Sequence, residues 1–130
     1  MILVHAGFMI AGFLSAASGA AIAKYFRKKK WWFTAHRGAG ISGSLFVTTG
    51  FAVAVYMVSH SGGEHFSIPH TVHGLIVLLF ALATPMLGFL QFRLTAHARQ
   101  IRTVHRWAGR ITIILMFVNI VSGLVISGLM

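Results

Sequence analysis

The chain has 130 residues, of which 57% are hydrophobic and only 9% are charged. A soluble domain of this length exposes too much surface for so few charged side chains to cover, so the composition indicates a membrane protein. Eleven Lys and Arg against a single acidic residue give a formal net charge of +10. Cysteine is absent, which excludes disulfides and thiolate-bound cofactors.

Four long apolar runs follow one another along the chain. They predict helices over about residues 2–26, 33–58, 69–92 and 103–129. Each run is close to the ~20 residues that a helix needs to cross about 30 Å of hydrocarbon, and none shows the alternation of a barrel strand. Because the links are short, consecutive helices should run in opposite directions. The sequence predicts an all-α membrane protein, with residues 1–130 forming one domain, an antiparallel four-helix transmembrane bundle.

The basic residues are segregated at one end of this predicted bundle. All eleven lie in or beside the first and third links: Lys24, Arg27, Lys28, Lys29, Lys30, Arg37, Arg93, Arg99, Arg102, Arg106 and Arg110. The middle link has no Lys or Arg and holds the only acid, Glu64. By the positive-inside rule, the two basic links should be cytoplasmic and both termini outside. A basic rim attracts anionic lipid, whereas nucleic acid would need no such segregation, so we expect a lipid partner and no nucleic acid.

One histidine lies near the start of each predicted helix: His5, His36, His73 and His105. An imidazole inside a membrane is costly without a partner, so these residues indicate a functional site. Since the helices alternate in direction, His5 and His73 should lie towards one membrane face, and the other two towards the opposite face. Two facing histidines at each level would suit two non-covalent haems with bis-histidine ligation. A zinc or copper site is less well matched, because neither pair has a nearby Cys, Asp or Glu.

The first two helices share the spacing H-x6-G-x6-G, through His5, Gly12 and Gly19 and through His36, Gly43 and Gly50. Opposite helix directions should bring Gly19 to the level of His36, and Gly50 to that of His5. The glycines would then leave room for a planar cofactor. Ordinary small-residue packing between membrane helices is the alternative.

Several motifs extend this pattern. His5-Ala-Gly-Phe-Met with Gly19-Ala-Ala-Ile-Ala-Lys-Tyr-Phe-Arg27, His73-Gly-Leu-Ile-Val, and His105-Arg-Trp-Ala-Gly-Arg110 with Val118-Asn-Ile-Val-Ser-Gly123-Leu occur in this order. They resemble the first, third and fourth core helices of the cytochrome b561 family, especially its DOMON-associated type. The second helix is similar only through His36 and its glycines.

The resemblance implies that His5 and His73 ligate an outer haem b, and that His36 and His105 ligate an inner one. Arg37 and Arg106 directly follow two of these ligands. They are candidates for pairing with haem propionates, and snorkelling at the helix ends is the alternative.

The expected function is transmembrane electron transfer through two b haems, from a cytoplasmic donor to an outer acceptor. Ascorbate is implied by eukaryotic relatives, and a quinol or a redox protein is an equal alternative. Ferric iron and a partner redox protein are candidate acceptors, and a reductase activity is left open. The main alternative is a haem-binding anchor subunit of a larger redox complex. A homodimer or a complex is expected to cover the bundle.

The other histidines are expected to be solvated. His60, His65 and His70 lie in or beside the middle link with Glu64, and His97 lies in the third link. The alternative for the middle link is a docking site for a metal ion or another acceptor near the outer haem. Asn119, deep in the fourth helix, is expected to hydrogen-bond between helices, and Pro85 should kink the third helix.

Overall fold

Four long helices make up almost all of the computed structural model, which describes residues 1–128. They are α1 (Ile2–Tyr25), α2 (Trp32–Ser61), α3 (Pro69–Arg93) and α4 (Ala98–Ile126), with a short 3-10 helix, η1 (Thr95–His97), before α4. The described part of the chain contains no strand. All four long helices have the length and apolar composition needed to cross a membrane. The prediction of an all-helical chain with four possible spans is therefore confirmed.

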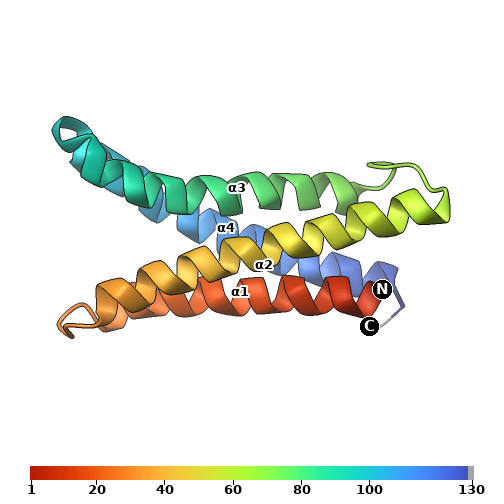
Figure 1. Cartoon of the computed structure of the whole chain (residues 1–130), viewed down its shortest axis with the longest axis horizontal. Coiled ribbons are helices and arrows are strands. Elements are labelled where there is room, and N and C mark those ends of the chain that lie inside the picture. Colours follow the sequence, from red (N-terminus) through yellow and green to blue (C-terminus); the bar gives the residue numbers. More distant parts are fainter. Residues whose placement is uncertain (129–130) are drawn as a thin grey trace.

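The chain runs the length of the molecule four times (Figure 1). The α1–α2 and α3–α4 links lie at one end, whereas the α2–α3 link and the N-terminus lie at the other. Helix α1 packs mainly along α2, and α3 mainly along α4. The molecule thus consists of two hairpins, α1–α2 and α3–α4, that meet along a sparser interface.

The ends of the middle helices follow from local backbone chemistry. Helix α2 stops at Gly62, whose φ of +69° is a left-handed conformation that costs glycine little. Helix α3 starts at Pro69, directly after the extended residue Ile68, where the missing proline N–H is not needed. Inside α3, Pro85 removes one backbone hydrogen bond. The end of α2 and the start of α3, on either side of the 62–68 link, are therefore fixed by Gly62 and Pro69.

Small residues let α1 and α2 approach closely. A Cβ atom on Gly12 would lie 2.9 Å from Val47 Cγ2 and 3.2 Å from the Gly43 carbonyl oxygen, too close for a larger side chain. The buried hydrophobic residues form one cluster: Met9, Val47, Val77, Ala81 and Met116. This cluster is the core of the bundle.

Most apolar side chains face outwards. In the most apolar window of each helix, only 11–17% of the residues are buried inside the bundle. Leu3, Leu45 and Met86 are each more than 60% exposed. In water such a surface would be costly, but in hydrocarbon it is the expected one, because lipid tails are as apolar as these side chains. The exposure pattern thus agrees with four membrane-spanning helices.

Candidate functional site

The structure brings His36 and His105 together near the basic links. Their ring centroids are 6.0 Å apart, with the planes at 84°. The Nδ1 atom of His36 lies 2.9 Å from the Gly19 carbonyl oxygen, and that of His105 lies 2.8 Å from the Thr84 carbonyl oxygen. Each ring is thus oriented by a backbone acceptor on the other helix of its own hairpin. We refer to His36 and His105 as the inner pair.

At the other end of the bundle, His5 lies opposite His70. The ring centroids are 6.4 Å apart and the planes meet at 87°. The Nδ1 atom of His5 lies 2.8 Å from the Gly50 carbonyl oxygen, and that of His70 lies 3.0 Å from Ser122 Oγ. The sequence predicts that His73 faces His5. In the structure His73 is exposed on α3. His5 and His70 form the outer pair.

Both pairs leave the second ring nitrogen available. When Nδ1–H donates to a carbonyl or hydroxyl oxygen, Nε2 is deprotonated and can bind a metal, and this outer hydrogen bond fixes the ring orientation. With metal–nitrogen bonds of about 2 Å, two imidazoles on opposite sides of one metal ion have centroids about 6 Å apart. The observed separations of 6.0 and 6.4 Å match that value. The ring separations of both pairs therefore suit two imidazoles on one metal ion.

Glycines make room for the histidines of the α3–α4 hairpin. A Cβ atom on Gly123 would lie 2.7 Å from His70 Cε1, and one on Gly88 would lie 3.3 Å from His105 Cε1. His70 and Gly88 on α3 have the same spacing in sequence as His105 and Gly123 on α4. This shared spacing was the available signal that His70, rather than His73, lies opposite His5.

The predicted glycine levels in the α1–α2 hairpin are confirmed by the contacts of Gly19 with His36 and of Gly50 with His5. These glycines also pack against the neighbouring helix. A Cβ atom on Gly19 would lie 3.3 Å from Ala39 Cβ, and one on Gly50 would lie 3.0 Å from Met9 Sδ. Small-residue helix packing thus accounts for both positions, and their carbonyl groups serve the histidines.

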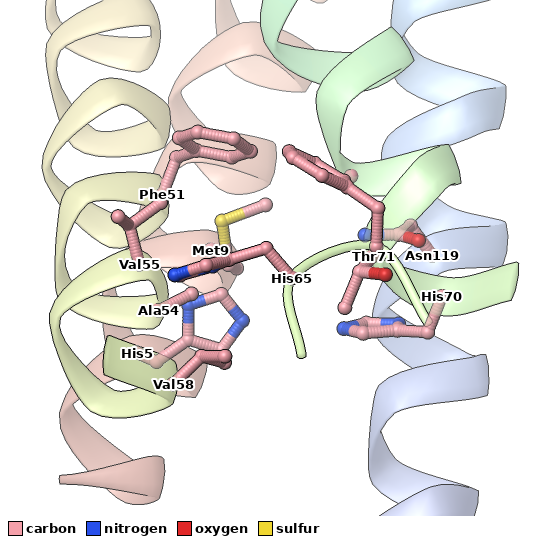
Figure 2. A pocket seen from close by; sticks show the side chains of 12 residues that line it. His5, Met9, Phe51, Ala54, Val55, Val58, His65, His70, Thr71 and Asn119 are labelled. Carbon is pink, nitrogen blue, oxygen red and sulfur yellow. The ribbon is translucent and has the colours of Figure 1, made fainter. Parts of the chain in front are cut away.

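A pocket of about 500 Å³, counted with its open side, lies between the hairpins at the outer pair. Figure 2 shows the His5 and His70 rings facing one another across it, with Asn119 on the same side as His70. The remaining lining is largely apolar and includes Met9, Phe51, Val55 and Phe66. A mostly apolar pocket with a few convergent polar groups is the kind of place where cofactors bind.

Two features of this pocket need a ligand or a constraint to explain them. Asn119 is only 3% exposed, and its Oδ1 atom has no hydrogen-bond partner within residues 1–128. Phe66, in the link that borders the pocket, has a φ of +62°, which is strained for a bulky side chain. Such strain clusters at functional sites. Both features support the pocket as a binding site.

Among the other candidate residues, His65 lines the pocket at the outer pair, whereas Arg37, Arg106, His60 and His97 do not. Arg37 and Arg106 are exposed, and the Arg37 guanidinium lies 6.0 Å from the centre of the Phe33 ring. His60 stacks on Tyr56 and His65 lies 3.2 Å from Ser59, both exposed in or beside the middle link, and His97 is exposed too. Within residues 1–128, no three His, Cys, Asp or Glu side chains are grouped to hold a metal ion.

Comparisons with family models, with curated proteins and with solved structures find no match to this chain. Two facing imidazole pairs therefore carry the functional argument.

Proposed function

We propose that this chain is a di-haem b electron-transfer protein, an antiparallel four-helix transmembrane bundle with a cytochrome b561-like core. One observation carries the proposal: two imidazole pairs, each across the interface between the hairpins, have separations suited to a shared metal ion. The inner pair would ligate one haem and the outer pair the other. Because the chain has no cysteine, both haems would be bound without a covalent link.

Bound haem would supply the one-electron redox chemistry, and the protein would control its site. The imidazoles would bind the iron, and the Nδ1 hydrogen bonds would hold the rings in place. The apolar lining of the outer pocket keeps water away and so influences the redox potential. Asn119 offers the one buried amide in that lining.

The spacing of the pairs supports transfer across a membrane. On α3, His70 belongs to the outer pair, whereas Gly88 packs against His105 of the inner pair. These positions are 18 residues apart in the numbering (88 − 70). At 1.5 Å per residue this corresponds to about 27 Å along the helix, close to the thickness of the hydrocarbon core. One site would then lie near each membrane surface.

The charge pattern supports a direction. The basic links share the end that carries the inner pair, so positive-inside orientation puts this pair at the cytoplasmic side and both termini outside. The donor would be ascorbate, a quinol or a redox protein on the cytoplasmic side. Since all the basic side chains lie at that end, an anionic donor would be attracted electrostatically. The acceptor would be outer ferric iron or a partner redox protein.

A haem-binding anchor subunit of a larger redox complex is the second candidate. The short segments between the helices, residues 26–31 and 62–68, favour it because they offer little surface for a separate substrate site. The two candidates share the ligands and differ in whether electrons pass from one pair to the other.

Sealed vesicles decide between them. Purified protein would be reconstituted with a reductant trapped inside and ferricyanide outside. We expect ferricyanide reduction by the intact protein, loss of transfer in His36→Ala and in His5→Ala, and normal transfer in the exposed control His73→Ala. Transfer that survives the loss of either pair would contradict the two-haem path. No transfer by a protein that holds both haems would favour the anchor subunit.

A further inference from the structure

The position of one hairpin relative to the other determines the geometry of both imidazole pairs. His5 on α1 faces His70 on α3, and His36 on α2 faces His105 on α4. Each pair therefore joins the α1–α2 hairpin to the α3–α4 hairpin. A change in their separation would move the two rings of each pair apart or together. Whatever fixes this separation also fixes the ligand geometry.

Within residues 1–128, a single hydrogen bond joins the two hairpins. The Ser44 hydroxyl on α2 donates to the Ala81 carbonyl oxygen on α3 at 2.6 Å. The other hydrogen bonds between helices stay inside one hairpin, such as those of His36 and His105. Ser44 Oγ also lies 3.1 Å from the Gly40 carbonyl oxygen of its own helix, and the contact with Ala81 is the shorter.

Pro85 explains why the Ala81 carbonyl group can accept this bond. In a regular helix the N–H of residue 85 would donate to the carbonyl oxygen of residue 81, but proline has no N–H. Ala81 is buried, at 5% exposure, so its carbonyl group would otherwise lack a partner in a water-free environment. Ser44 supplies the missing donor from the neighbouring hairpin.

The same segment of α3 supports the inner pair. Thr84, the residue before Pro85, provides the carbonyl oxygen that accepts from His105 Nδ1. Gly88, less than one turn after Pro85, packs against the His105 ring. The hydrogen bond from Ser44 therefore attaches α2 to the part of α3 that holds His105.

We propose that Ser44 and Pro85 form a polar clamp between the hairpins, in which Pro85 frees the Ala81 carbonyl group and Ser44 binds it. Ser44 is a positioning residue: it sets the distance between the hairpins and so the distance between the two rings within each imidazole pair. This role rests on the proposed haem function for its effect on cofactor binding, whereas the coupling between Ser44 and Pro85 is a property of the protein alone.

A double-mutant cycle tests the clamp. In the wild-type background, we expect Ser44→Ala to weaken haem binding at both sites about 3- to 20-fold, the range for hydrogen bonds between membrane helices. It should also shift the redox midpoints of both haems. In Pro85→Ala the restored N–H satisfies the Ala81 carbonyl group, so adding Ser44→Ala should then change neither property. An equal effect of Ser44→Ala in both backgrounds, or none in the wild type, would overturn the proposal.

Matched variants keep the test independent of Pro85. Ser44→Thr retains the hydroxyl group and should bind haem like the wild type. Ser44→Val has the shape of the threonine variant without its hydroxyl donor and should bind haem more weakly. Thr48→Val is the control: Thr48 lines a groove between α2 and α3 together with Ser44 and Pro85, but its hydroxyl donates to a carbonyl oxygen of its own helix. Equal behaviour of Ser44→Thr and Ser44→Val would contradict the clamp.

The readouts also separate the two proposals. A wild-type protein that binds no haem would contradict the proposed function. The same cycle would then be measured on unfolding of the haem-free protein, where the clamp predicts that Ser44→Ala lowers stability only in the presence of Pro85. If the two substitutions had additive effects on the free energy of unfolding, the clamp would be refuted independently of the proposed haem function.

Discussion

Replacing Gly123 by Ala should expel or distort the outer haem while leaving the inner one in place. Gly123 lies on α4 directly against the His70 ring, and the new methyl group would be 2.7 Å from His70 Cε1. Ordinary contact begins at 3.4 Å, so the ring must move by at least 3.4 − 2.7 = 0.7 Å. Metal–ligand distances vary by only about 0.2 Å, so iron ligation cannot absorb this displacement.

The expected cost is that of overpacking a filled site, about 1–3 kcal/mol. This corresponds to roughly a 5- to 150-fold loss of affinity for the outer haem. Without haem the His70 ring can turn away, since it is the end of a side chain. The substitution should therefore affect cofactor binding far more than folding.

The equivalent position at the inner pair provides the control. A methyl group on Gly88 would be 3.3 Å from His105 Cε1, so the ring needs to move by only 3.4 − 3.3 = 0.1 Å. Gly88→Ala should retain both haems, as should Gly38→Ala, where the methyl group meets nothing within 4 Å. Reduced-minus-oxidised spectra and haem content of the three purified variants provide the assay. A Gly123→Ala protein with two unperturbed haems would refute the proposed role of His70.

Three further predictions concern the outer site and the orientation. His70→Ala should remove only the outer spectral component, and His73→Ala should retain both; the opposite result would restore His73 as the ligand. Ser122→Ala removes the acceptor of His70 Nδ1 and should weaken outer haem binding about 10-fold, as is common for such second-layer partners; an equal loss at the inner site would argue against this local role. In sealed cells, an external thiol reagent should label Ser61→Cys and not Lys29→Cys, and external labelling at residue 29 would reverse the orientation.

The helices could be predicted from the sequence because lipid imposes simple requirements. A helix must be about 20 apolar residues long, and its ends carry most of the charge. Helix bounds shifted by several residues at three ends: α2 continues to Ser61, α4 already begins at Ala98, and α4 ends at Ile126. Polar residues can extend a helix beyond the hydrocarbon, so hydropathy alone does not mark these ends.

The inner pair could be predicted because each of its helices has one histidine at the required level. At the outer end, α3 offers two, and the choice depends on how α3 is rotated about its axis. That rotation is set by packing against α4, where Gly123 makes room for His70 and Ser122 binds its Nδ1 atom. A contact between helices decides the pairing, and the level of a residue along its own helix cannot reveal it.

Haem stoichiometry of the purified wild-type protein tests the central claim most directly. Two facing imidazole pairs predict two b haems per chain, both six-coordinate in the oxidised and reduced states. One haem per chain would contradict the two-site bundle, and a protein that binds none when haem is supplied in excess would contradict the proposed function altogether.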